Sequence, residues 1–167
     1  MSKPKVHAKI ERATLFDKLK ESDRGCVILM GAILEEDLRR LHHAKVNLIF
    51  AERGITDTTK IDVDGRLPNF AVKIFAAFEC ALISEEERNA LDLIRNLRNE
   101  AAHLEYKFSF EDEGVKKRLN KLRDVVSPER TNTEWAGQKR NFLALATELD
   151  ETLKSKHTEL VRQINAL

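Results

Sequence analysis

The feature that most constrains the fold is residues 23 to 53, which open with the nearly continuous apolar run CVILMGAIL. Beyond that run, leucines continue at helical spacing, at Leu34, Leu38, Leu41 and Leu48. Apolar residues that recur every three or four positions mark one face of an α-helix. We therefore predict a long helix over 23–53 that is the central and most buried element of the protein.

Composition supports a helical fold for the rest of the chain. The 167 residues include only 6 Gly and 3 Pro, with 42% hydrophobic and 34% charged residues. Such a balance favours helices joined by short loops over a sandwich or barrel. The 29 Lys and Arg nearly cancel the 28 Asp and Glu, so any attraction for nucleic acid has to be local. We predict one all-α domain over residues 1–167, a bundle of five to six helices.

Start and stop signals divide the chain into these helices. Pro68 suits a first helical turn, Ser84 and Glu87 have capping-box spacing, and Ser127 with Pro128 interrupts a helix. Besides the central helix, the predicted helices span residues 5–20, 68–82, 84–106, 112–124 and, as a second long helix, 133–165.

The cysteines and the absence of long apolar stretches suggest where the protein works. Cys26 and Cys80 sit among apolar residues and lack the spacing of metal ligands, so we interpret both as reduced core residues. The N-terminus has no apolar core typical of a signal peptide. No stretch approaches the ~20 apolar residues of a membrane span. These features predict a cytoplasmic protein with no membrane partner.

The predicted helix 84–106 carries a polar stripe within IRNLRNEAAHLEY. Arg95, Asn99 and His103 follow one another at intervals of four residues, which places them on one side of a helix. Arg98 lies at the border of the stripe, roughly 140° around the axis from His103. Arg98 and His103 of one chain are therefore not expected to meet head-on.

A second copy of this helix would bring the two groups together. Ala101 and Ala102 leave room for close approach, and a two-fold axis would place each stripe against the other. A guanidinium binds a phosphate through two parallel hydrogen bonds, and a histidine exchanges a proton near neutral pH. Such a pair is sufficient for attack of a ribose 2′-hydroxyl on its own phosphate without a metal. On spacing alone, a solvated helix face is the favoured interpretation.

The segment Arg98-Asn99-Glu100-Ala101-Ala102-His103 resembles the arginine–histidine motif of HEPN domains, including the polar residue after the arginine. HEPN domains are helical bundles that usually dimerise, and many are metal-independent ribonucleases of toxin-antitoxin, phage-defence and RNA-processing systems. The resemblance implies that Arg98 and His103 are the catalytic pair, facing across a homodimer, with Asn99 positioning. It implies RNA as substrate and an antitoxin as a possible partner.

The position of Tyr106 and the charge of Glu100 differ from the usual HEPN pattern. Toxin-type members commonly place a tyrosine two residues after the histidine, whereas here Leu104 and Glu105 precede Tyr106. Glu100 adds a negative charge inside the motif, and we expect it to pair with Arg95, Arg98 or Lys107. Arg95, Glu100 and Tyr106 are therefore interpreted as supporting residues of the site.

A longer stretch is similar to the mannitol operon repressor family of bacterial regulators. DRGCVILMGAILEEDLRRL, followed by GRLPNFAVKIFAAFECALISEEERNALDLIRNLRNEAAH, resembles that family's order of helices and turns over about residues 23 to 115. This resemblance implies an all-helical regulator that works through contact with a transcription-related protein. No helix-turn-helix pattern with a basic recognition helix stands out. A non-enzymatic regulator is thus the alternative to a ribonuclease.

A basic stretch follows the stripe, in residues 115 to 140. Clustered cations can follow an RNA backbone, and Trp135 could stack a base or anchor in the core. A solvated basic helix would have the same composition. The residues of this weaker RNA-binding prediction are Lys116, Lys117, Arg118, Lys121 and Arg123.

Adjacent histidines at positions 42 and 43 raise the question of a metal site. Neighbouring helical side chains point about 100° apart, and no further histidine or carboxylate has the spacing that completes a tetrahedral set. We predict neither a metal nor a cofactor for this chain.

Overall fold

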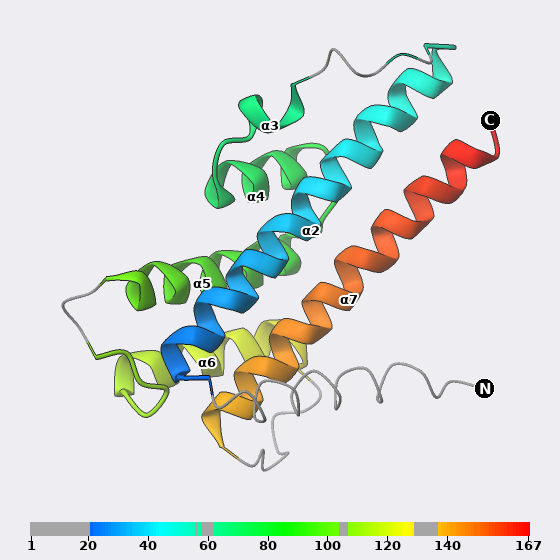
Figure 1. Cartoon of the computed structure of the whole chain (residues 1–167). Helices are drawn as coiled ribbons and strands as arrows, with labels where there is room; N and C mark the ends of the chain where they lie inside the picture. Colours follow the sequence, from blue (N-terminus) through cyan, green and yellow to red (C-terminus); the bar gives the residue numbers. More distant parts are fainter. Residues whose placement is uncertain (1–20, 56, 58–61, 104–106, 129–136) are drawn as a thin grey trace.

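The computed structural model describes residues 21–55, 57, 62–103, 107–128 and 137–167, and within them every regular element is a helix. The all-α prediction is confirmed for these residues. No helix among them is long and apolar enough to cross a lipid bilayer. The elements are α2 (Asp23–Glu52), α3 (Val63–Arg66), α4 (Phe70–Glu79), α5 (Glu85–Ala102), α6 (Glu113–Val126) and α7 (Gln138–Asn165), labelled in Figure 1.

Two long helices form the body of the molecule. α2 and α7 lie side by side and run in the same direction (Figure 1). α5 and α6 pack against each other, and together they cross the N-terminal halves of α2 and α7 (Figure 1). α4 packs on α5 and on α2. The buried side chains of all these helices form one hydrophobic cluster, whose largest fully buried members include Met30, Leu34, Leu38, Ile94, Leu97, Leu122 and Phe142.

The helix starts follow the sequence signals closely. Ser22 caps α2, and its hydroxyl accepts a hydrogen bond from the backbone N–H of Gly25 at 3.0 Å. The capping box at α5 is complete: the Ser84 hydroxyl accepts from the N–H of Glu87, and the Glu87 carboxylate accepts from the N–H of Ser84. The backbone of Gly54, just after α2, has φ +70°, a conformation that favours glycine. These ends confirm the predicted boundaries near 22, 53 and 84.

Several predicted boundaries were wrong. Pro68 lies before α4 rather than in its first turn, because the Asn69 side chain caps the helix at Phe70. α3 occupies part of the predicted loop, with the Asp62 carboxylate accepting from the N–H of Gly65 at 2.6 Å. α5 ends at Ala102 instead of 106, and α7 is described from Gln138. The predicted helix 5–20, residues 133–136 and Trp135 lie outside the described residues.

The prediction that Cys80 is a core residue was also wrong. Cys26 is fully buried as predicted, whereas Cys80 is exposed at the C-terminal end of α4. α4 packs inward through Phe70, Ile74 and Ala77, so its other side faces outward although it is also apolar. Phe75 on that outer side is 55% exposed.

Candidate functional site

His103 lies directly after the last turn of α5. Its backbone is extended (φ −69°, ψ 118°), and its N–H donates to the carbonyl of Glu100. The Arg24 guanidinium reaches over from α2 and donates to the carbonyl of Ala102 at 3.2 Å. A cation at this end of a helix satisfies an otherwise unpaired carbonyl and complements the helix dipole. The imidazole of His103 is therefore carried on a fixed helix end and remains exposed.

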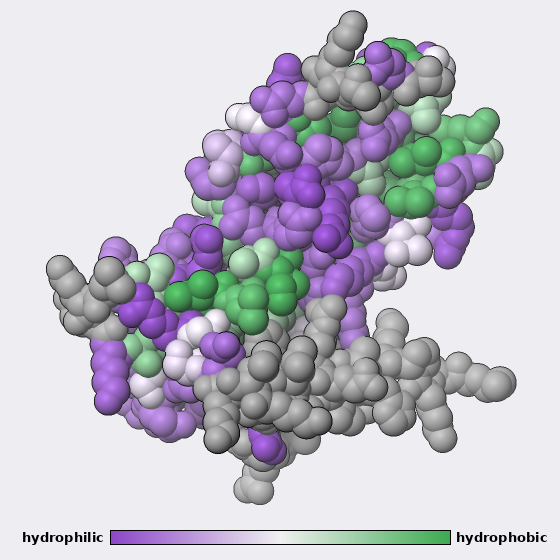
Figure 2. Space-filling view, in the orientation of Figure 1, coloured by the Kyte–Doolittle hydropathy of each residue, from purple (hydrophilic) through white to green (hydrophobic). Residues whose placement is uncertain are grey.

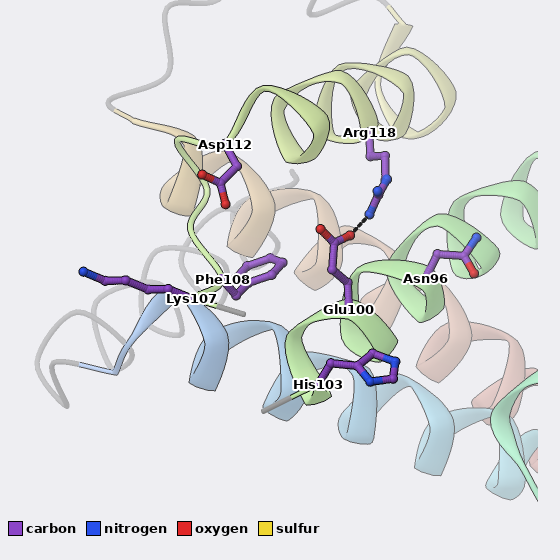
Figure 3. A pocket seen from close by; sticks show the side chains of 7 residues that line it. All are labelled: Asn96, Glu100, His103, Lys107, Phe108, Asp112 and Arg118. Atoms are coloured by element: carbon purple, nitrogen blue, oxygen red, sulfur yellow. Dashed lines mark hydrogen bonds and ion pairs between the residues drawn. The ribbon is translucent and has the colours of Figure 1, made fainter. Parts of the chain in front are cut away.

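His103 borders an open cleft of about 710 Å³ between the end of α5, residues 107–112 and the start of α6 (Figure 3). The segment beneath the cleft is fixed to the core, since Phe110 packs between Phe108 and Phe142, with ring centroids 5.6 and 5.3 Å away. Its backbone is also tied to α2, because the N–H of Phe110 donates to the Asp23 carboxylate at 3.0 Å. The residues lining the cleft are Asn96, Glu100, His103, Lys107, Phe108, Asp112 and Arg118.

One ion pair crosses this cleft from α5 to α6. The Arg118 guanidinium donates to the Glu100 carboxylate, as the dashed line in Figure 3 marks. The expectation that Glu100 pairs with Arg95, Arg98 or Lys107 was wrong, because α6 brings Arg118 alongside it. Both side chains are more than a third exposed, at 36% and 40%. Ion pairs in such settings typically contribute about 0–1 kcal/mol, so this pair is easily exchanged for another partner.

Arg98 points away from the cleft toward α2. Its side chain crosses Gly31, where an added Cβ would lie 2.9 Å from the Arg98 Cδ. Its Nη2 lies 3.5 Å from one carboxylate oxygen of Glu35, and Lys73 donates to the other at 2.9 Å. The Glu35 carboxylate therefore holds the guanidinium in place, and the Arg98 side chain remains 33% exposed.

The other residues of the predicted stripe and its neighbours differ in their contacts and exposure. The Arg95 Nε donates to Asp92 at 3.0 Å, an interaction within α5, and Asn99 is exposed. Ala101 is fully buried in the chain's own core, so the prediction that it makes room for a second helix was wrong, whereas Ala102 is exposed. Tyr106 lies outside the described residues.

Sequence reasoning missed Gly31, Glu35 and Arg24. A glycine inside a long helix lowers its stability unless another element packs closely against it. Gly31 could therefore have predicted a close contact at this point of the helix. Glu35 lies one turn further along the same face. Nothing in the sequence linked Arg24 to Ala102, which is 78 residues away.

Most of the predicted basic surface on α6 is already paired with carboxylates. Lys116 lies near Glu111 (3.2 Å) and Glu113 (3.4 Å), and these contacts, led by the hydrogen bond to Glu111, raise the pKa of Lys116. Arg123 lies 3.4 Å from its neighbour Asp124. Lys117 and Lys121 are exposed. α6 therefore presents scattered cations rather than a continuous basic face.

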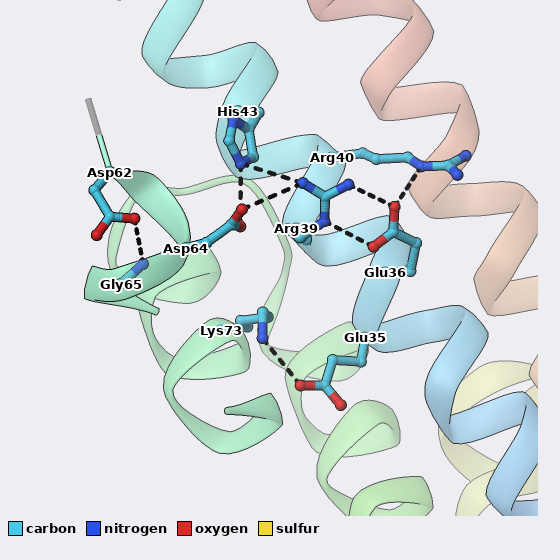
Figure 4. A network of polar contacts seen from close by, with 9 residues as sticks. All are labelled: Glu35, Glu36, Arg39, Arg40, His43, Asp62, Asp64, Gly65 and Lys73. Atoms are coloured by element: carbon cyan, nitrogen blue, oxygen red, sulfur yellow. Dashed lines mark hydrogen bonds and ion pairs between the residues drawn. The ribbon is translucent and has the colours of Figure 1, made fainter. Parts of the chain in front are cut away.

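Polar contacts join α2 to α3 and α4, and His43 is one of the residues that make them (Figure 4). His42 is buried, its Nε2–H donates to the carbonyl of Lys73 at 2.9 Å, and burial lowers its pKa. His43 contacts Asp64 at 3.2 Å, and this hydrogen bond lowers the pKa of Asp64. Beside them, hydrogen bonds from Arg39 and then Arg40 lower the pKa of Glu36 to about 2. No group of three or more metal-ligating side chains occurs within the described ranges.

An apolar area lies over the N-terminal half of α2, visible as green surface in Figure 2. Leu29 is 40% exposed, Ala32 is exposed, and Ile28 and Ile33 are half-buried. Ile28, Ala32 and Glu35 share one face of α2 by their spacing. The apolar area therefore adjoins the contact between Glu35 and Arg98.

Comparison with known proteins gives no assignment. No protein-family model, curated protein or solved structure matches this chain.

Proposed function

We propose that this protein is a metal-independent endoribonuclease that acts as a homodimer, with Arg98 binding the phosphate and His103 transferring protons. One observation carries the proposal: an exposed His103 borders an open cleft at the end of the same helix that holds a half-exposed Arg98. The resemblance of residues 98–103 to the HEPN motif supplies the class of reaction.

The opposite directions of the two side chains favour a site built from two copies. Arg98 reaches over α2 toward Glu35, while His103 borders the cleft between α5 and α6. A second copy seated over Leu29 and Ala32 would cover the apolar area beside Arg98. We propose that the two-fold axis of this contact passes close to the end of α5, where it would bring Arg98 of each chain toward His103 of the partner subunit. Burial of apolar surface would stabilise the dimer.

The chemistry needs only the protein's own groups. His103 accepts the proton of the ribose 2′-hydroxyl, and the 2′-oxygen then attacks the adjacent phosphorus. The P–O5′ bond breaks, the leaving O5′ takes up a proton supplied by the protonated His103 directly or through water, and the products carry a 2′,3′-cyclic phosphate and a 5′-hydroxyl. The Arg98 guanidinium stabilises the charge that develops on the phosphate, and the Asn99 amide orients it.

Purified protein incubated with single-stranded RNA in excess EDTA is expected to give fragments that end in cyclic phosphate. Mass spectrometry of the fragments identifies these ends, because they lack the water that hydrolysis to a linear phosphate adds. Full activity in EDTA follows from a mechanism without a metal. Intact RNA after incubation with a correctly folded, dimeric protein would refute the proposal.

We further propose a cellular setting on the basis of the HEPN resemblance. A ribonuclease of the stress-response, toxin-antitoxin or phage-defence type acts in the cytoplasm and needs an inhibitor until it is required. An antitoxin that covers the cleft beside His103 would block substrate entry. The partner in this setting is a protein, and RNA is the substrate.

A second function, a regulator similar to the mannitol operon repressor family, is favoured by one specific observation. The cations of α6 are largely paired, while the outer side of α4 exposes Phe75. Such a face suits contact with a transcription-related protein better than contact with RNA. Under this alternative the EDTA assay leaves RNA intact, and the protein binds a transcription factor or polymerase subunit in a manner that Phe75→Asp abolishes.

A further inference from the structure

We propose that the cleft between α5 and α6 is a second phosphate subsite, in which Arg118 binds an RNA phosphodiester next to the one that is cleaved, and that Glu100 occupies Arg118 when RNA is absent. This inference rests on the proposed ribonuclease function and names the path of its substrate. It assigns Glu100 a role as a competitor of RNA.

The position of the cleft relative to His103 is the first support. Glu100 lies in the last turn of α5, His103 follows directly after that helix, and both line the cleft (Figure 3). A strand whose reacting phosphate lies at His103 therefore has its neighbouring phosphates within or beside this cleft. The volume of about 710 Å³ lies in the range of small-molecule sites and suits a nucleotide unit.

The lining chemistry is the second support. Arg118 and Lys107 are cations and Asn96 offers amide donors and an acceptor on the α5 side, while the lining also carries the carboxylates of Glu100 and Asp112. A guanidinium presents paired N–H groups that match two oxygens of a carboxylate or of a phosphate equally well. The Glu100 carboxylate thus fills the position on Arg118 that a phosphodiester would take.

The weakness of the ion pair is the third support. Glu100 and Arg118 are both more than a third exposed, so water competes for each of them. A phosphate carried by a strand already bound at His103 has a high effective concentration at Arg118. RNA can therefore displace Glu100, at the cost of a repulsion between that carboxylate and the strand.

The test measures binding of a 2′-O-methyl RNA oligonucleotide, which has no free 2′-hydroxyl and is not cleaved. Glu100→Gln removes the competing charge, so we expect its dissociation constant to fall by roughly 3–10-fold relative to the wild type. Because Arg118 binds the same phosphate in both proteins, the logarithmic salt dependence is expected to stay unchanged. Arg118→Gln added to Glu100→Gln is expected to cancel the gain in affinity and to flatten the salt dependence by about 0.7, the value of one lost phosphate contact on a single strand.

Glu159→Gln is the matched control. It removes the same charge and releases Arg162 from an ion pair near the C-terminal end of α7, the end of that helix that lies away from α6 (Figure 1). Unchanged or weaker binding by Glu100→Gln, or an equal gain in Glu159→Gln, would overturn the inference. Because the oligonucleotide is not cleavable, these results are read separately from the EDTA assay, whose failure bears on the ribonuclease proposal alone.

Discussion

Replacing His103 with alanine, or Arg98 with glutamine, is expected to lower the rate of RNA cleavage at least about 100-fold. Proton transfer by a positioned side chain typically contributes about 10²–10⁴-fold to a rate. Removing one group that stabilises developing charge commonly costs about 10²–10³-fold. Single-turnover cleavage of a fluorescent RNA, with enzyme in excess over substrate, measures these losses without interference from product release.

Both variants are expected to keep the fold. His103 is exposed, so its replacement removes little packing. After Arg98→Gln, Glu35 still contacts Lys73 at 2.9 Å and is not left as an uncompensated charge. The controls are His157→Ala and Arg162→Ala on α7, which remove the same groups away from the cleft. Equal cleavage by His103→Ala and His157→Ala would show that a contaminant or another site is responsible.

The second large effect concerns a pair of buried carboxyl groups between the two long helices. Asp37 of α2 is 5% exposed, and Asp150 of α7 is fully buried. Burial raises the pKa of Asp37 from 3.8 to about 7, assisted by its hydrogen bond to Asp150 and by repulsion between the two. Lys154, 2.7 Å from Asp150, and Arg40 act in the opposite direction. Asp37 is therefore protonated in the folded protein under mildly acidic conditions.

The raised pKa makes this region more stable in acid. Below about pH 4 Asp37 is protonated in both the folded and unfolded chain, and it imposes no cost. Between about pH 4 and 7 only the unfolded chain releases the Asp37 proton. The free energy of unfolding therefore falls as the pH rises through this range. Above about pH 7 the full cost, roughly 2–4 kcal/mol for a change of this size, remains.

Asp37→Asn is expected to stabilise the protein at pH 8 by roughly 2–4 kcal/mol and to have little effect near pH 4. Asparagine has no charge to bury, and its amide can donate to Asp150. Urea unfolding followed by circular dichroism at the two pH values measures the difference. Asp64→Asn is a control of opposite sign, because the contact with His43 lowers the pKa of Asp64. An Asp37→Asn effect that is the same at both pH values would contradict the proposed protonation.

The helices could be predicted from the sequence because local rules determine most of their starts. The Ser84–Glu87 capping box and the Ser22 cap depend on neighbouring residues alone; the capping box formed as predicted, and the Ser22 cap begins α2 at the predicted position. The end of α5 depends instead on Arg24, which caps Ala102 from a distant part of the chain. The exposure of Cys80 was missed for a similar reason, since an apolar helix does not reveal which of its sides meets the core.

Less of the candidate site could be predicted. The sequence singled out Arg98 and His103 as candidates, and helical spacing predicted that their side chains point in different directions. The partners of these residues lie on other helices: Glu35 on α2 holds Arg98, and Arg118 on α6 pairs with Glu100. Such pairings depend on how α2, α5 and α6 pack against one another, which no local pattern encodes.

The central claim is that Arg98 of one chain and His103 of another form one active site, and mixed dimers test it most directly. Arg98→Gln and His103→Ala chains with different affinity tags are refolded together, and the doubly tagged dimer is purified. That dimer contains one site with both residues intact, so we expect it to recover about half of wild-type cleavage although each parent is inactive. A mixed dimer as inactive as its parents would contradict a site shared between subunits.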